Sequence, residues 1–151
     1  MDTIRGAGDV AAAADTANTM LIVDDDEVNR TILANMFSDC YTIEEAENGQ
    51  EALSWIQSAE QRPCAVLLDV VMPGLDGLQV LERLHGAGLT AEFPVFLITA
   101  EASGSTMEAA YQMGVMDVIS KPVIPYVVRR RVSSVVELFQ ARRKLGGMVE
   151  R

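Results

Sequence analysis

Residues 65–77 read AVLLDVVMPGLDG, an apolar run that ends in the acid Asp69 and leads into a loop. Four successive apolar residues are typical of a short strand that is buried on both faces. The Pro-Gly and Asp-Gly pairs after it indicate a turn, and the leucines between residues 78 and 84 then recur at helical spacing. This stretch therefore predicts a buried strand, a loop that begins with an acid, and a helix.

The same alternation continues on both sides of this stretch. Such alternation predicts an α/β fold, in which five parallel strands form one sheet and helices cover both faces. We expect strands at 20–23, 41–43, 65–68, 95–98 and 118–119, and helices over 28–38, from Gly49, from Leu78, over 104–113, and from about Pro125 to Leu145, where Gly146-Gly147 ends the last one.

Length and composition suit one domain of 151 residues. We interpret residues 1–19 as a mobile N-terminal arm, 20–145 as the domain and 146–151 as a tail. No apolar run reaches the roughly 18 residues that a membrane span needs, and the N-terminus lacks a basic start followed by an apolar stretch. We therefore expect no membrane contact. Cys40 and Cys64 are expected to be buried free thiols, which predicts a cytoplasmic protein because free thiols persist in a reducing compartment.

Charge is distributed unevenly along the chain. Residues 1–120 hold 4 basic and 20 acidic groups, whereas residues 121–151 hold 8 basic and 2 acidic groups. An acidic body argues against nucleic acid as a direct partner. The basic C-terminal segment is either a solvated helix face or a docking surface for an acidic partner.

Polar residues follow four of the predicted strands at the point where each strand ends. They are Asp24-Asp25-Asp26, Asp69, Thr99 and Lys121. Ligands of open parallel sheets bind outside the carboxyl ends of the strands, so we expect these side chains to lie together.

Clustered carboxylates repel one another, and Mg²⁺ relieves this because it prefers carboxylate oxygens and water. An aspartate can act as a nucleophile toward phosphorus, while a lysine and a hydroxyl can stabilise the phosphoryl oxygens. Each element alone is ordinary, since three acids after a strand form a solvated turn and helix cap. Their joint order at four strand ends predicts phosphoryl transfer.

Four motifs together resemble the receiver domain of two-component response regulators. The resemblance covers about residues 19–145 and implies a doubly wound, flavodoxin-like sheet of order 2-1-3-4-5. The motifs are LIVDDD at 21–26, LLDVVMPGLDG at 67–77, LITA at 97–100 and SKP at 120–122.

The resemblance implies a role for each acid. Asp69 matches the phosphoacceptor. Asp25 matches a direct Mg²⁺ ligand, Asp24 a ligand that acts through water, and the backbone carbonyl of Val71 a further ligand. The phosphodonor would be a histidine kinase or a histidine phosphotransfer protein, and the receiver would catalyse its own phosphorylation and dephosphorylation.

The resemblance also implies how the signal leaves the site. Thr99 matches a switch hydroxyl that moves toward the phosphoryl group, and Lys121 matches the phosphate-pairing lysine, with a cis peptide before Pro122. Val118 stands where the family often has an aromatic residue, so the usual coupling to the last helix is in doubt. Val71 is apolar beside the acceptor, from which we expect slow self-dephosphorylation.

The last helix carries a possible partner surface. Valines at 128, 132 and 135 and Phe139 follow a 4-3-4 spacing. This stripe either packs on the sheet of the same chain or, beyond about residue 138, serves a homodimer or leads to an output domain that is missing here. The chain is then an excised fragment or a single-domain regulator that contacts an effector.

Two other functions fit part of the pattern. A phosphatase of the haloacid-dehalogenase type also uses a nucleophilic aspartate with Mg²⁺, but it needs a second acid where Val71 stands and a nucleophile on the first strand. A pseudo-receiver that only binds partners is the other alternative. Turnover of a phosphate monoester would identify the phosphatase, and failure to accept a phosphoryl group would identify the pseudo-receiver.

Overall fold

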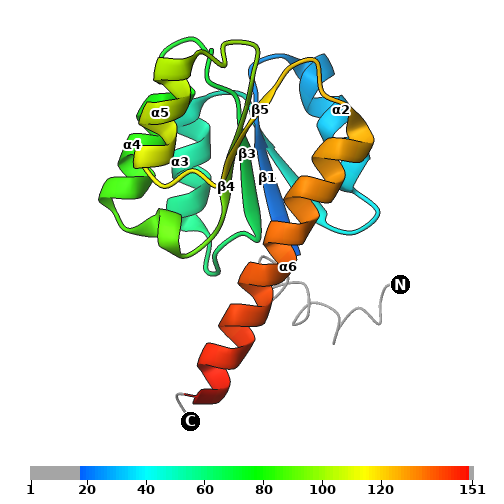
Figure 1. Ribbon diagram of the computed structural model, residues 1–151, viewed down its shortest axis with the longest axis vertical. Coiled ribbons are helices and arrows are strands. Elements are labelled where there is room, and N and C mark those ends of the chain that lie inside the picture. The colour runs from blue at the N-terminus through cyan, green and yellow to red at the C-terminus, as the bar shows by residue number, and fades with distance from the viewer. Residues whose placement is uncertain (1–17, 150–151) are drawn as a thin grey trace.

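The computed structural model describes residues 18–149 and forms one five-stranded parallel sheet of order β2-β1-β3-β4-β5 (Figure 1). The predicted fold class and strand order are confirmed. Along the chain the elements are β1 Thr19–Val23, α2 Glu27–Phe37, β2 Thr42–Ala46, α3 Gly49–Ser58, β3 Ala65–Leu68, α4 Gly77–Gly86, the 3₁₀ helix η2 Leu89–Ala91, β4 Val95–Thr99, α5 Gly104–Gln112, β5 Asp117–Ser120 and α6 Pro125–Val149.

The sheet separates two apolar cores. On one face α3, α4 and α5 cover strand residues such as Leu21 and Val23, while on the other α2 and α6 cover Met20 and Ile22. Alternate residues of a strand point to opposite faces, so a strand buried on both faces must be apolar throughout. This explains why β1, β3 and β4 appear in the sequence as uninterrupted apolar runs.

Side-chain caps fix where the helices begin. Asp26 accepts hydrogen bonds from the backbone amides of Val28 and Asn29 at the start of α2, as the sequence predicts. Asp76 and Gln79 form a reciprocal capping box on α4. A Cβ at Gly77 would overlap the backbone oxygen of Asp69, so only glycine lets α4 begin directly against the end of β3.

Several expectations need correction. The last helix continues through Gly146-Gly147 to Val149 instead of ending there, because a helical glycine costs about 1 kcal/mol relative to alanine but keeps its backbone hydrogen bond. Cys64 is buried as expected, but Cys40 is exposed. The 3₁₀ helix η2 has no counterpart among the predicted elements. Residues 1–17 of the expected arm lie outside the described residues.

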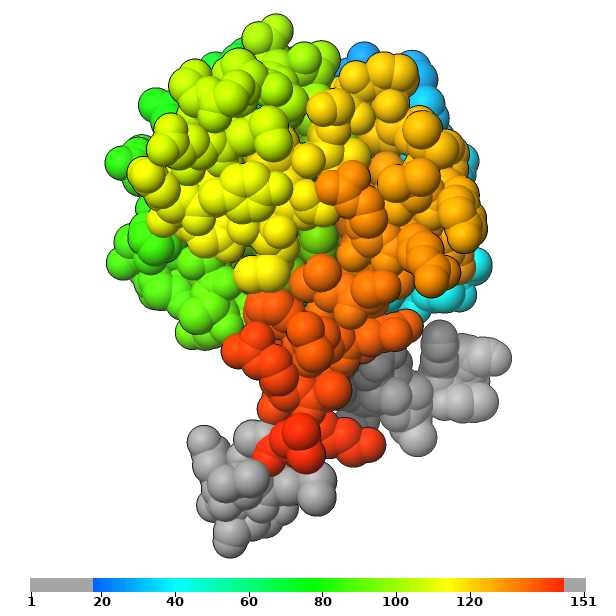
Figure 2. Space-filling model, in the orientation of Figure 1, coloured from blue at the N-terminus to red at the C-terminus, as the bar shows by residue number. Residues whose placement is uncertain are grey.

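The first half of α6 packs on the sheet of its own chain. Val128, Val132 and Phe139 are buried, and Val136 takes the fully buried place that was expected for Val135. Beyond the sheet the helix projects from the body (Figure 2), and Leu138 and Leu145 are exposed. Within residues 18–149, no helix combines the length and apolar character that crossing a membrane requires.

Candidate functional site

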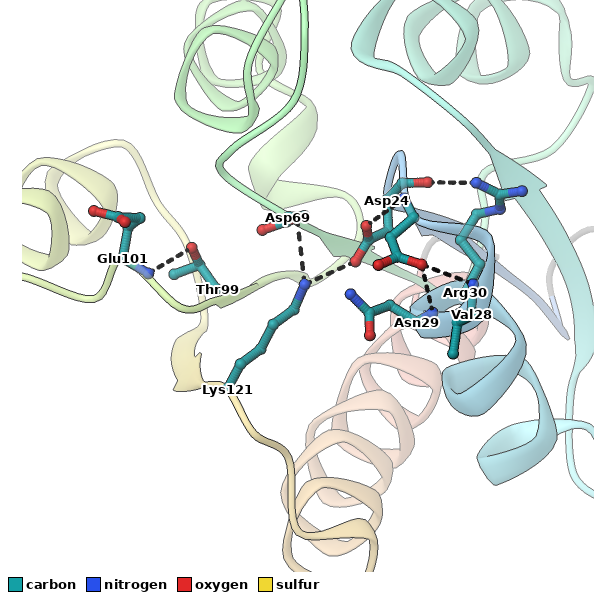
Figure 3. Close-up of polar contacts among 9 residues, drawn as sticks. Asp24, Val28, Asn29, Arg30, Asp69, Thr99, Glu101 and Lys121 are labelled. Carbon is teal, nitrogen blue, oxygen red and sulfur yellow. Dashed lines mark hydrogen bonds and ion pairs between the residues drawn. The ribbon is translucent and has the colours of Figure 1, made fainter.

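The expected polar residues meet at one edge of the sheet (Figure 3). Asp24 follows β1, Asp69 follows β3, Thr99 ends β4 and Lys121 follows β5. Val23 of β1 is paired in register with Leu68 of β3, so the two acids that come next leave neighbouring strands at the same level. The parallel register is therefore what brings residues 45 positions apart in the sequence into one site.

Three carboxylates form a cluster within this site. Asp24, Asp25 and Asp69 each offer one oxygen, and these oxygens lie within 4.8 Å of one another. Asp24 and Asp69 are only 1% and 7% exposed, whereas Asp25 is exposed to solvent. Two buried acids and one exposed acid supply the oxygen ligands that suit Mg²⁺, and the open side leaves room for the water molecules that this ion retains.

Lys121 bridges the two buried acids. Its Nζ donates hydrogen bonds to Oδ2 of Asp24 at 2.9 Å and to Oδ2 of Asp69 at 3.3 Å. Burial lowers the pKa of Lys121, but the contacts with both carboxylates outweigh burial and leave the pKa above its ordinary value. The lysine is therefore charged and partly offsets the repulsion between the acids. The expected cis peptide between Lys121 and Pro122 is present.

Asp69 is held in an environment that disfavours its charged form. Burial is the largest cause and raises the pKa of its carboxyl above the ordinary value; the nearby charge of Asp24 raises it further. Lys121 and a backbone hydrogen bond involving Val71 act in the opposite direction without cancelling the increase. One lysine thus leaves the negative charge incompletely neutralised, and the site fits an added divalent cation.

Thr99 is fully buried beside this cluster, and its Oγ1 accepts a hydrogen bond from the amide of Glu101 at 3.0 Å. The hydroxyl is therefore turned toward the loop that leads into α5. Val118 is buried in the core that lies under α3, α4 and α5. The position itself holds an aliphatic side chain, and the hydroxyl of Tyr111 on α5 adds polar contacts to β5: it donates to Asp117 at 3.2 Å and accepts from the amide of Val118 at 3.3 Å.

Val71 lies in the loop after β3, and its side chain is 56% exposed. The apolar side chain expected beside the acceptor is thus accessible to solvent. Assignment of the Val71 backbone carbonyl as a ligand stays a prediction.

Sequence reasoning missed Arg30 of α2. Its guanidinium is buried, with NH1 donating to the backbone oxygen of Asp24 at 2.7 Å and Nε donating to Glu45 of β2 at 3.1 Å. The available signal was weak: a single basic residue that follows four acids within residues 24–30. Only the fold shows that this arginine turns back toward the end of β1.

An apolar hollow of about 430 Å³ adjoins the acidic cluster. Ile32 and Leu33 of α2 line it together with Val123 of the β5–α6 connection and Pro125 at the start of α6, and Lys121 contributes to the same wall. Near it, Val28 and Ile124 are 65% and 63% exposed. Asp25 lines a separate hollow with Glu47 and Asn48, so the cluster is bordered by an apolar surface on the side of Lys121 and by a more polar one on the side of Asp25.

Comparison with known proteins gives a consistent result. A family model described as response regulator receiver domain matches residues 20–133. The response regulator MprA of Mycolicibacterium vanbaalenii is 41% identical over 104 residues, which are 68% of this chain and 43% of MprA. The cyclic di-GMP phosphodiesterase response regulator RpfG of Xanthomonas campestris is 32% identical over 136 residues, which are 88% of this chain and 35% of RpfG.

Solved structures show the same fold. A CheY-like receiver domain protein from Methanospirillum hungatei matches with a TM-score of 0.75 at 23% identity, and the match covers 83% of this chain and 98% of that one. The chain spans less than half the length of these two curated relatives.

Proposed function

Since the chain belongs to the response regulator receiver domain family, we propose that it is a phosphorylation-dependent signalling switch in which Asp69 accepts the phosphoryl group. The observation that carries this proposal is the arrangement around Asp69: Lys121 bonds to it and to Asp24, and Asp25 completes the cluster. A nucleophile, a cation and a set of metal ligands are thus within reach of one phosphoryl group.

The chemistry follows from these groups. An oxygen of the Asp69 carboxylate attacks the phosphorus of a phosphohistidine, the new O–P bond forms as the N–P bond breaks, and the leaving imidazole takes a proton from water. Asp24, Asp25, Asp69 and the Val71 carbonyl would hold Mg²⁺, which when bound neutralises charge on the phosphoryl oxygens. Lys121 is placed to pair with the same oxygens. We propose that self-dephosphorylation returns the domain to its starting state.

We propose that the phosphodonor is a histidine kinase or a histidine phosphotransfer protein, which docks on the apolar hollow beside the site. Exposed Val28, Ile32 and Ile124 provide the contact area, and the hollow includes Lys121 in its wall. A donor held there would bring its phosphohistidine to the edge at which Asp69 lies. Thr99 would then exchange the amide of Glu101 for a phosphoryl oxygen.

We propose that residues 20–145 form the switch and that α6 transmits its state to an effector or an output domain. The projecting part of α6 supports this proposal, as does the similarity to RpfG, which is named as a phosphodiesterase response regulator and of which the match covers 35%. Leu138 and Leu145 lie seven residues apart on the exposed side, a spacing that would suit pairing with a second copy. Light scattering before and after phosphorylation tests this dimer.

The phosphoacceptor is tested by incubating the chain with Mg²⁺ and acetyl phosphate and then measuring its intact mass. We expect wild type to gain one phosphoryl group and Asp69→Ala to gain none. Asp76→Asn is the matched control, because Asp76 lies in the same loop but caps α4 and asparagine caps equally well; it should be phosphorylated like wild type. Equal phosphorylation of Asp69→Ala would refute the assignment.

A further inference from the structure

We infer that Arg30 is a positioning residue for the acidic cluster, because it fixes the peptide unit between Asp24 and Asp25. The inference rests on the proposed metal site and deepens it. Arg30 itself touches no carboxylate of the cluster: among the described residues, the partners of its guanidinium are the Asp24 backbone oxygen and Glu45. Its effect on the site therefore passes through the backbone.

Every polar atom of Asp24 has a separate partner. Its amide donates to Ala46 of β2, Oδ1 accepts from the amide of Asp26 and Oδ2 accepts from Lys121. Its backbone oxygen accepts the 2.7 Å bond from NH1 of Arg30 (Figure 3). Arg30 is thus the only one of these partners that holds the carbonyl side of the residue.

That carbonyl determines the direction of the next residue. The C=O of Asp24 and the N–H of Asp25 belong to one planar peptide unit, so anchoring the oxygen fixes the orientation in which the chain enters Asp25. Within residues 18–149, the exposed carboxylate of Asp25 makes no hydrogen bond or ion pair that would hold it in place. The Asp26 amide holds the chain after Asp25 through Oδ1 of Asp24, and the Arg30 bond holds the peptide before it, so the distance of Asp25 from Asp24 and Asp69 depends in part on Arg30.

Glu45 makes this arrangement compatible with a cation. The guanidinium is buried, with its side chain 10% exposed, and Glu45 Oε1 accepts from its Nε at 3.1 Å. The carboxylate balances the positive charge that would otherwise repel a metal ion beside Asp24. The planar guanidinium makes both bonds at once, which the single ammonium group of a lysine cannot do with the same geometry.

The test is a Mg²⁺ titration of the full chain followed by backbone amide NMR. Removing a group that orients a metal ligand typically weakens metal binding 10–100-fold, so we expect Arg30→Gln to raise the Kd for Mg²⁺ by about tenfold. The Asp25 amide signal should also shift before any metal is added. Arg62→Gln is the matched control and should bind Mg²⁺ like wild type. It removes an exposed ion pair with Glu92 at the amino ends of the strands, away from the acidic cluster at their carboxyl ends.

A second readout separates positioning from a loss of stability. With acetyl phosphate as donor, the Mg²⁺ concentration for half-maximal phosphorylation should rise in Arg30→Gln, whereas the rate at saturating Mg²⁺ should stay close to that of wild type. A purely structural role would lower the melting temperature without moving that half-maximal concentration. If Arg30→Gln does not fold, Arg30→Lys keeps the charge and the aliphatic stem, and we expect several-fold weaker Mg²⁺ binding from it.

Wild-type affinity in a folded Arg30→Gln or Arg30→Lys would overturn the inference. If wild type itself bound no Mg²⁺, the proposed metal site would fail instead, so the two failures are distinguishable.

Discussion

At the scale of single residues, the site is centred on a buried acid whose charge is incompletely neutralised. Asp69 is buried next to Asp24, and one lysine serves both carboxylates. If each of the two carboxylates had its own basic partner, the site would have no excess negative charge to attract a cation. Without Lys121, the two buried carboxylates would repel each other with no compensating charge. If Asp69 is the phosphoacceptor that we propose, the side chains that adjoin this set determine how long a phosphoryl group survives there.

Val71 provides the first prediction. Its apolar side chain cannot orient a water molecule toward the phosphoryl group, so we expect slow self-dephosphorylation in wild type. Val71→Asn should shorten the lifetime several-fold, because an amide can hold the attacking water. The measurement follows the phosphorylated chain after removal of the donor. Val71→Ala is the control and should remain slow; loss of the group from wild type within seconds would contradict this account.

Cys64 provides a prediction about pH. Burial raises the pKa of its thiol from 9.0 to about 12, and only the thiolate reacts readily. A thiol reagent should therefore label one cysteine per folded chain, Cys40, from neutral pH up to about pH 9, and both cysteines after denaturation. Rapid labelling of Cys64 in the folded chain would show that its environment is more open.

The same shift affects stability. Because the folded pKa exceeds the unfolded one, the contribution of the protonated Cys64 thiol to stability is complete below pH 9.0 and is lost as pH rises toward about 12.

The sequence was sufficient to predict most of the site but not its supporting contacts. Asp24, Asp69, Thr99 and Lys121 could be placed because each follows a strand whose apolar run is unmistakable, and parallel strands end at one edge. Arg30 could not, because its partner is a backbone oxygen and its position within α2 resembles that of any surface arginine. Contacts of this kind depend on side-chain direction, which periodicity does not encode.

At the scale of elements, prediction was best where burial is complete. The range of β3 was predicted without error, because Ala65–Leu68 is apolar throughout. The edge strand β2 was predicted to end at Ile43 but continues to Ala46 through Glu44 and Glu45, since an edge strand tolerates exposed charged side chains. Gly146 and Gly147 gave a wrong prediction of where α6 ends. Glycine ends a helix when it adopts a left-handed conformation at the helix C-terminus, and within a helix it only lowers the stability.

The third prediction concerns the anchoring of α6. The guanidinium of Arg143 donates to the backbone oxygens of Glu92 at 2.9 Å and Pro63 at 3.4 Å. These bonds hold the helix to the loops that precede β3 and β4. Arg143→Gln should cost about 1 kcal/mol of stability and speed hydrogen exchange over residues 139–145. Mass spectrometry of exchanged peptides measures this effect.

Lys144→Gln is the control for that experiment. Lys144 is exposed, and this substitution removes the same charge from the neighbouring position. Equal exchange in both variants would mean that the bonds of Arg143 do not hold the helix.

At the scale of the whole molecule, the uneven charge has a structural explanation. Arg129 pairs with Asp39, and Arg131 pairs with Asp117, so part of the basic segment holds α6 against the acidic body. Neither expectation for this segment, a solvated face or a docking surface, anticipated that role. The projecting part of α6 is the surface for which we propose pairing with a second copy or an effector.

The central claim is that the switch operates through an acyl phosphate on Asp69. It is tested most directly by treating the phosphorylated chain with borohydride, which reduces an acyl phosphate to an alcohol, and then sequencing its peptides by mass spectrometry. We expect homoserine at position 69 and at no other acid, and none when Mg²⁺ is omitted. Homoserine at Asp24, Asp25 or Asp76 with an unchanged Asp69 would contradict it.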